Sequence, residues 1–313
     1  MADNDFWQGK KVIVTGGGGF IGSYVVRNLV EKRGVSETNI VIPRSKDCDL
    51  REFKNCVRIV KDCQIVIHLA AVTGGIHFSR TCPAKQYYDS SFIDMNMIEA
   101  ACREGVEKFV AIGNLFAYAG DVSMPIREEY LFNGLPSDAH RGVGWFKRNL
   151  ALLADIYYRQ YNMPMVVVYS ANAYGPGDTL DREHAHVIPA TIMKCLYEHE
   201  LIVWGDGSPT RDFLYVEDIA EGLVLAAEKM TPPNYVNIGS GNEISIKELV
   251  HYITKYSDFK GKVKFDGTKP GGDARRCTDY TKASRVMNFT PVFDIEEGIK
   301  KTVAWYKSKL MPA

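Results

Sequence analysis

The stretch KVIVTGGGGFIGS, residues 11–23, decides the fold. An apolar run of strand length leads into a glycine loop with the spacing Gly16-x-x-Gly19-x-x-Gly22, and a segment of helical period follows at once. In the first βα turn of a dinucleotide-binding fold, the first glycine permits the tight turn, the second lets the backbone approach a pyrophosphate, and the third lets the helix pack on the sheet. The helix N-terminus then supplies N–H donors to the phosphates. The alternative is a tight βα turn without a ligand, but this context favours a dinucleotide site made of Gly16, Gly19, Phe20, Ile21 and Gly22.

From this loop onward, apolar runs of strand length alternate with longer segments of helical period. Such alternation predicts a parallel sheet with helices on both faces. Strands are expected at 39–43, 64–71, 108–113 and 163–170, and helices at 20–34, 90–105, 149–162 and 187–200. Residues 201–230 predict a strand pair that leads into a helix.

We therefore predict an α/β protein with a Rossmann-type doubly wound parallel sheet and a smaller C-terminal α/β part that binds the substrate. Residues 8–172 are expected to form the dinucleotide-binding domain. Residues 173–313 are expected to form mainly a substrate-binding cap, with some segments that return to the sheet. The cap should lie over the carboxyl edge of the sheet, where open parallel sheets bind ligands.

Composition narrows the classes of function. Lys plus Arg and Asp plus Glu number 38 each, so no long-range field draws the chain to nucleic acid or a membrane, and any bound anion must be held locally. The seven cysteines are odd in number and lack CxxC spacing, which favours reduced thiols over a disulfide framework or a metal site. No leader segment or apolar membrane span is visible, so we expect a soluble, cytoplasmic protein.

Several motifs together resemble one family. The pattern T-G-x-x-G-x-x-G at 15–22, HLAA at 68–71 and NAYGPGD at 172–178 resemble the extended short-chain dehydrogenase/reductases that act on nucleotide sugars. The similarity covers nearly the whole chain and is greatest to the GDP-fucose synthase branch. The segments that carry this branch resemblance are 71–84, 186–190, 203–214 and 265–276. The resemblance implies a nicotinamide dinucleotide, a nucleotide-sugar substrate that is GDP-linked, and a homodimer or homotetramer.

The choice of cofactor depends on the end of the second strand, which runs into PRSKDCD at 43–49. Arg44 and Lys46 favour the 2′-phosphate of NADP, whereas Asp47 or Asp49 would bind the ribose hydroxyls of NAD. The branch also carries an arginine inside the glycine loop, where this chain has Gly18. We predict NAD, with NADP as the alternative. Further contacts to the dinucleotide are expected from Arg44, Ala70, Lys147 and Asn172.

The catalytic set departs from the family pattern. The family pairs a Ser or Thr after the fourth strand with Tyr-x-x-x-Lys on the next helix, where the tyrosine exchanges a proton with the sugar and the lysine lowers the tyrosine pKa. Here the tyrosine position is Val143, while Lys147 is retained. Asn114 and Leu115 replace the serine pair of the branch, and Phe116 replaces its catalytic cysteine. We therefore assign the catalytic set to Lys147, His186 and Asn114, with Val143 marking the missing tyrosine.

These replacements change the expected chemistry. His186 matches the acid/base histidine of the branch, but Phe116 makes the double epimerisation of GDP-fucose synthase improbable, because that reaction needs both the cysteine and the histidine. Orientation of the two ligands could still supply several kcal/mol of the barrier. The proton acceptor could be a water, His186, Lys147, Tyr118 or Tyr174.

The substrate side offers a flat aromatic wall and several cations. Matching positions in the family contact the nucleotide diphosphate, and arginine forks suit phosphate oxygens. The alternative is a set of surface salt bridges. The predicted substrate-binding residues are Lys194, Trp204, Arg211, Arg275 and Arg276.

We expect an NAD(P)-dependent nucleotide-sugar oxidoreductase that acts at C4 of a GDP-linked hexose or heptose without the usual tyrosine. An epimerase or dehydratase with relocated acid/base groups is the first alternative. A catalytically inactive relative that binds a dinucleotide is the second.

Overall fold

A computed structural model describes residues 5–74, 76–182, 185–269 and 273–311. Its centre is a parallel sheet of six strands in the order β2-β1-β3-β4-β5-β9. The strands are β1 (Val12–Thr15), β2 (Ile40–Val41), β3 (Ile65–His68), β4 (Lys108–Asn114), β5 (Met165–Ser170) and β9 (Asn234–Ile238). The order reverses between β1 and β3, and open α/β sheets bind ligands at the carboxyl ends of the strands at such a point. The predicted doubly wound sheet is confirmed.

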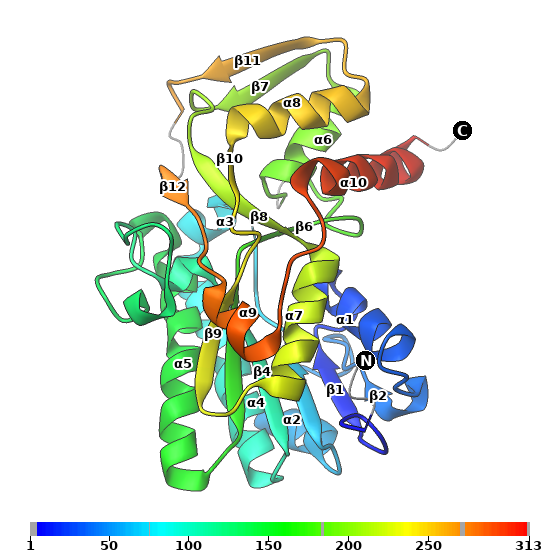
Figure 1. The fold of residues 1–313 in the computed structure, drawn as a ribbon, viewed down its shortest axis with the longest axis vertical. Coiled ribbons are helices and arrows are strands. Elements are labelled where there is room, and N and C mark those ends of the chain that lie inside the picture. The colour runs from blue at the N-terminus through cyan, green and yellow to red at the C-terminus, as the bar shows by residue number, and fades with distance from the viewer. Residues whose placement is uncertain (1–4, 75, 183–184, 270–272, 312–313) are drawn as a thin grey trace.

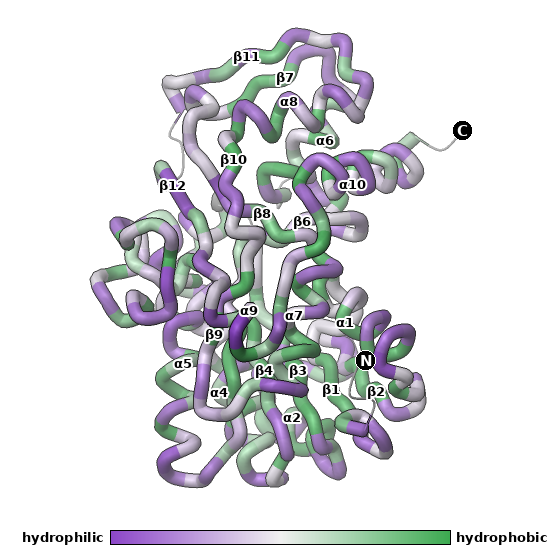
Figure 2. Tube along the Cα trace, in the orientation of Figure 1, coloured by the Kyte–Doolittle hydropathy of each residue, from purple (hydrophilic) through white to green (hydrophobic). Residues whose placement is uncertain are grey.

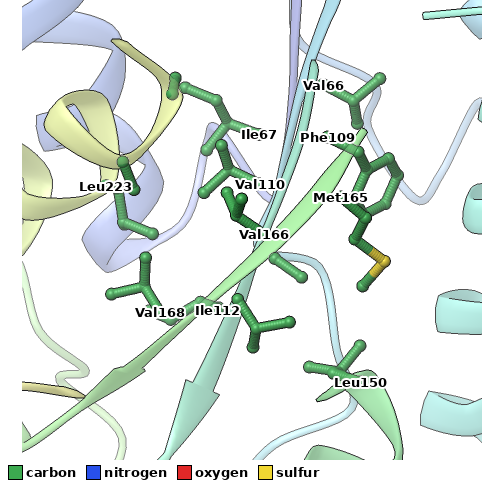
Figure 3. Packing of buried hydrophobic residues seen from close by; sticks show 14 of the residues in the cluster. Val66, Ile67, Phe109, Val110, Ile112, Leu150, Met165, Val166, Val168 and Leu223 are labelled. Atoms are coloured by element: carbon green, nitrogen blue, oxygen red, sulfur yellow. The ribbon is translucent and has the colours of Figure 1, made fainter. Parts of the chain in front are cut away.

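Helices cover both faces of this sheet (Figure 1). They are α1 (Phe20–Glu31), α2 (Phe53–Val60), α4 (Pro83–Arg103), α5 (Arg141–Tyr161), α7 (Val216–Lys229) and α9 (Thr281–Met287). Figure 3 shows Leu223 of α7 on one side of the strands and Leu150 of α5 on the other. Val110 and Phe109 are neighbours on β4 and point to opposite sides, as a pleated strand buried on both faces requires.

Two predicted helices begin earlier than the sequence suggested. The helix expected at 90–105 begins at Pro83, a residue whose fixed φ suits the first helical turn. The helix expected at 149–162 begins at Arg141, with Gly142 and Gly144 in its first turn. Glycine disfavours a helix interior, but here it permits close packing. A Cβ at Gly144 would lie 2.5 Å from the carbonyl oxygen of Phe116.

The C-terminal part adds two smaller sheets above the carboxyl edge of the main sheet (Figure 1). One consists of β6 (Asn172–Tyr174), β8 (Thr210–Tyr215), β10 (Glu243–Ser245) and β12 (Arg275–Arg276). The other pairs β7 (Glu200–Trp204) with β11 (Lys262–Asp266) in parallel. The accompanying helices are α6 (Val187–Tyr197), α8 (Ile246–Ser257) and α10 (Ile295–Leu310). The strand pair predicted at the start of 201–230 is wrong, because β7 and β8 belong to different sheets and find their partners far along the chain.

Short helices complete the connections. They are η1 (Glu37–Asn39), α3 (Ile76–Thr81), η2 (Leu115–Ala117), η3 (Glu128–Tyr130) and η4 (Asp138–His140). Two of them, η2 and η4, lie at the carboxyl end of β4 and at the start of α5, so they frame the region where the family carries its catalytic residues.

The apolar residues gather in two clusters. The larger fills the space between the main sheet and its helices, where Figure 2 shows the strands in green, and the smaller lies among α6, α8, α10 and the adjoining strands. All seven cysteines are free thiols. Within the described ranges, no helix has the length and apolar character needed to cross a bilayer.

Candidate functional site

The glycine loop connects β1 to α1 at the point where the strand order reverses. Gly16 has φ +69°, a left-handed conformation that glycine adopts without strain. A Cβ at Gly22 would lie 2.2 Å from the carbonyl oxygen of Gly16, so α1 packs too closely for a side chain there. A Cβ at Gly19 would meet only that carbonyl, at 3.2 Å. The space in front of Gly19, at the N-terminus of α1, is therefore open to a pyrophosphate.

Other predicted dinucleotide contacts surround this loop. A Cβ at Gly16 would lie 3.1 Å from the Ala70 nitrogen, which places the end of β3 against the loop. Phe20 and Ile21 form the half-buried start of α1. The Tyr24 hydroxyl donates to the carbonyl of Pro176 at 2.9 Å, so the loop after β6 folds over the start of α1.

Arg44 follows β2 and covers the glycine loop. A Cβ built on Gly18 would lie 1.3 Å from Nη1 of Arg44, so the guanidinium occupies the place that a side chain at position 18 would take. Asp49, a predicted ribose ligand, is instead bound by Arg51, with Arg51 Nη2 2.7 Å from Oδ2. This hydrogen bond lowers the pKa of Asp49. The edge of the dinucleotide site thus presents one exposed arginine.

A buried histidine ties the ends of β1 and β3 to α4. His68 Nδ1 lies 2.8 Å from the Thr15 hydroxyl, and His68 Nε2 lies 3.0 Å from Asp94 Oδ1. The Thr15 hydroxyl also accepts hydrogen bonds from the backbone N–H groups of Leu69 and Ala70, at 3.0 and 3.2 Å. This network fixes the strand ends from which the glycine loop departs.

Three of the four predicted catalytic positions, Asn114, Val143 and Lys147, lie at the end of β4 and the start of α5, whereas His186 lies just before α6. Val143 and Lys147 lie one turn apart, and each is 5% exposed. Lys147 Nζ donates to the Ile112 carbonyl at 2.8 Å. Burial lowers the pKa of Lys147, and the Asp94 carboxylate opposes that change. Asn114 ends β4 and accepts a hydrogen bond from the Phe116 N–H at 3.1 Å, so its amide caps η2.

Sequence reasoning missed a histidine beside this set. The His140 imidazole stacks on the Phe116 ring with centroids 3.7 Å apart and an interplanar angle of 9°. It is 8% exposed, and its Nδ1 lies 3.3 Å from the Ser137 hydroxyl. Its position three residues before Val143, at the start of the helix that carries Lys147, is the signal that could have identified it.

Two arginines face each other across the small upper sheet. Arg211 on β8 is the register partner of Arg276 on β12. Arg276 is 2% exposed; its Nη2 lies 2.9 Å from Asp273, and its Nη1 donates to the Leu115 carbonyl at 3.3 Å. Burial lowers the pKa of Arg211; Asp273 opposes this effect and Arg276 adds to it. The Asp273 carboxylate thus offsets the charge of both guanidinium groups. The pair keeps a net positive charge, which suits the binding of an anion.

The other predicted substrate residues are not gathered with this pair. Arg275 alternates with Arg276 on β12 and pairs with Glu243 on β10. Lys194 Nζ donates to the Ile202 carbonyl at 3.1 Å. Trp204 is 58% exposed on β7. His186 is exposed just before α6, and its side chain makes no capping hydrogen bond to that helix.

The remaining candidates are engaged elsewhere. The Tyr118 hydroxyl donates to Asn237 Oδ1 at 2.6 Å, and burial raises the pKa of Tyr118 well above its ordinary value. The Tyr174 hydroxyl donates to the Asp294 carbonyl at 3.4 Å, and burial raises its pKa as well. Asn172 Nδ2 donates to the Asp212 carbonyl at 3.0 Å. The two tyrosines therefore act as packing residues.

Together, the glycine loop at the switch point of a parallel sheet and the buried lysine on the helix after β4 define a dinucleotide-dependent enzyme of the short-chain dehydrogenase/reductase class. Residues 12–239 match the NAD dependent epimerase/dehydratase family. The chain belongs to this family, so the predicted family and the expectation of an enzyme are confirmed.

Individual relatives agree over the full length. A GDP-L-fucose synthase of Sinorhizobium fredii (strain NBRC 101917 / NGR234) is 32% identical and covers 97% of this chain, which covers 97% of that protein. A GDP-L-colitose synthase of Yersinia pseudotuberculosis is 28% identical, with coverage of 95% and 97%. The crystal structure of a GDP-L-fucose synthetase from Naegleria fowleri bound to NADP has a TM-score of 0.86 and 26% identity, and the alignment covers 98% of this chain and 95% of that one.

Proposed function

We propose that this chain is an NAD(P)-dependent nucleotide-sugar oxidoreductase that acts at C4 of a GDP-linked hexose or heptose without a catalytic tyrosine. The observation that carries the proposal is the buried Val143 one turn before the buried Lys147, with Arg211 and Arg276 paired in the small sheet above the carboxyl edge of the main sheet. A lysine kept in place without its tyrosine suits a site that still holds a dinucleotide. The GDP-sugar names of the relatives support the choice of substrate.

The roles of the residues follow from their positions. The backbone N–H groups at the start of α1 bind the pyrophosphate, and Gly16, Gly19 and Gly22 leave the room it needs. Lys147 holds the ribose hydroxyls next to the nicotinamide. When bound, the dinucleotide supplies the hydride acceptor or donor. Arg211 and Arg276 hold the diphosphate of the sugar nucleotide and so orient the sugar toward Asn114 and Val143.

The test is a redox assay on a substrate panel. Purified protein is mixed with NAD or NADP and with GDP-linked or UDP-linked hexoses and heptoses, and the reduced-nicotinamide absorbance is followed. We expect hydride transfer with a GDP-linked sugar and a 4-keto product. An isomerised or dehydrated sugar without net change in the dinucleotide would favour an epimerase or dehydratase. Silence on every sugar would favour an inactive dinucleotide-binding relative.

For the cofactor we propose NAD. Gly18 provides no second cation in the glycine loop, where Arg44 takes the place of a side chain, whereas a 2′-phosphate is best held by more than one donor. Arg44 keeps NADP as the alternative. Calorimetry with both dinucleotides decides between them: binding of NADP more tightly than NAD would overturn this choice.

We also propose a homodimer or homotetramer whose subunits meet through α4 and α5. Both helices expose apolar side chains at helical spacing on one face, and such a patch commonly marks a protein interface. These side chains are Tyr88, Phe92, Met95, Leu152 and Ile156. Sedimentation of the wild type and of Leu152→Glu tests this assignment. We expect an oligomer for the wild type and a smaller mass for the variant, and a wild type that sediments as a monomer would contradict the assignment.

We propose that 8–172 binds the dinucleotide and that 173–313 mainly binds the substrate, with the same division along the chain that the sequence suggested. The strand β9 of the main sheet, contributed by Asn234–Ile238, belongs to the segments that return. The seven free thiols are consistent with a cytoplasmic location.

A further inference from the structure

The imidazole of His140 lies at the start of α5, close to Val143, the position where the family resemblance predicts a tyrosine. His140 is the residue immediately before α5, and Val143 lies in its first turn. The His140 ring stacks on the Phe116 ring, and Gly144, the residue after Val143, packs against the Phe116 carbonyl. His140 and the vacant tyrosine position therefore both lie beside Phe116.

We propose that His140 replaces the missing tyrosine and exchanges a proton with the sugar hydroxyl through its Nε2 atom. This inference rests on the proposed function, because it assigns a residue to that reaction.

The ring geometry selects the nitrogen. Phe116 covers one face of the imidazole, with centroids 3.7 Å apart. Nδ1 is 3.3 Å from the Ser137 hydroxyl, so an Nδ1–H can donate to that oxygen and leave the lone pair on Nε2. Among the described residues, no hydrogen bond to Nε2 is present. Phe116 thus fixes the ring plane, and the Ser137 hydroxyl can accept from Nδ1–H in the tautomer that leaves Nε2 free to take a proton.

The surrounding charges connect His140 to the substrate. Burial lowers the pKa of His140 to about 4; Asp273 opposes that change, and Arg276, Arg211 and Arg80 add to it. The free site therefore holds a neutral imidazole at pH 7. A bound diphosphate would offset the arginine charges and raise the pKa of His140. The imidazole becomes a better base when the sugar nucleotide is in place.

The step balances in both directions. On oxidation, the sugar C4–H bond breaks and its hydride reduces the nicotinamide dinucleotide, while the hydroxyl proton passes to Nε2 and the C–O bond becomes a carbonyl. On reduction, His140 returns that proton to the forming alkoxide.

The first test compares three variants on the GDP-sugar that the wild type converts. His140→Gln should lower kcat by about 10²- to 10⁴-fold, the usual contribution of an acid/base group, with a change in substrate Kd of less than about 3-fold. The acid limb of the kcat profile against pH should disappear as well. His251→Gln, on the exposed face of α8, is the matched control and should keep wild-type kcat. Full kcat in His140→Gln, or a large loss confined to His186→Gln, overturns the inference.

The second test does not depend on turnover or on a folded His140 variant. Wild-type protein labelled with ¹⁵N-histidine is titrated by NMR with and without saturating GDP, and the His140 signal is assigned by elimination against variants of the other six histidines. We expect its pKa to rise from about 4 toward neutrality when GDP binds. An unchanged titration overturns the inference.

The two levels of the proposal fail differently. A wild type that converts no GDP-sugar refutes the proposed function and the base role with it. A wild type that is active, together with an active His140→Gln, refutes only the role of His140.

Discussion

The glycine loop and the start of α5 are the two halves of the candidate site, and they are built by different means. At the loop, function depends on the space that the glycines leave open. Gly16 adopts the left-handed conformation of the turn, and Gly22 lets α1 pack against the loop with no room for a side chain. At α5, the proposed function depends on which side chains are present. By the family resemblance, Val143 stands at the position of a tyrosine, and Phe116 at that of the cysteine of the GDP-fucose synthase branch. The glycine loop can be recognised from the spacing of its glycines alone. The start of α5 can keep its backbone geometry while substitutions change its chemistry.

The largest effect on ligand affinity should come from the glycine loop. Gly19→Val should reduce dinucleotide affinity by on the order of 100-fold, about 2.8 kcal/mol, because the new side chain fills the space for the pyrophosphate. The fold should survive, since a Cβ there meets only the Gly16 carbonyl, at 3.2 Å. Calorimetry measures the affinity. Gly267→Val is the control because nothing lies within 4 Å of its Cβ. Unchanged affinity in Gly19→Val would sink the dinucleotide assignment.

The next effect concerns the stability of the fold at acid pH, to which His140 at the start of α5 contributes. The folded pKa of His140, about 4, lies below the ordinary 6.5, so the unfolded chain binds a proton in this window that the native protein does not. His140 therefore contributes up to roughly 3 kcal/mol of stability above pH 6.5, which is lost as the pH falls through 4. His140→Gln should flatten the change in unfolding free energy between pH 7 and pH 4. Urea denaturation of both proteins gives the difference, and parallel profiles would mean that His140 is not buried as a neutral ring.

The comparison also explains how far sequence could go. The positions of five of the six central strands and of the glycine loop were predictable, because apolar runs and glycine spacing are local signals, whereas β9 was not predicted. The start of α5 was not, since Gly142 and Gly144 disguise a helix whose first turn must pack against Phe116. His140 was missed because its role depends on a ring stack with a residue 24 positions earlier in the chain. Arg275 and Arg276 looked equivalent in sequence, yet the pleat of β12 sends one toward Glu243 and the other toward Asp273.

The third prediction tests whether Arg211, in the small upper sheet, binds the substrate or only stabilises the fold. Arg211→Ala should weaken GDP binding by about 1.5–3 kcal/mol, the contribution of a hydrogen bond to a charged group, with little effect on the dinucleotide. Arg159→Ala, a surface arginine at the far end of α5 that pairs with Asp155, is the matched control. Calorimetry with GDP and with NAD gives both affinities. Equal losses for the two ligands would make Arg211 structural.

The smallest effect is expected where the family pattern is restored. Val143→Tyr places a phenol one turn before Lys147, and Asn114→Ser adds its usual partner. In a site that has merely lost its acid/base pair, this double change would recover about 10²- to 10⁴-fold in rate. Here Val143 is 5% exposed, so a phenol must displace packed neighbours, and it would duplicate the proton acceptor that we assign to His140. We therefore expect slow but measurable wild-type oxidation and no more than about a 3-fold gain in either variant, with hydride transfer to the bound dinucleotide as the measure. If the wild type is inactive and the double variant is active, α5 is the remnant of an ordinary tyrosine-dependent site. In that case only the glycine loop has kept its function.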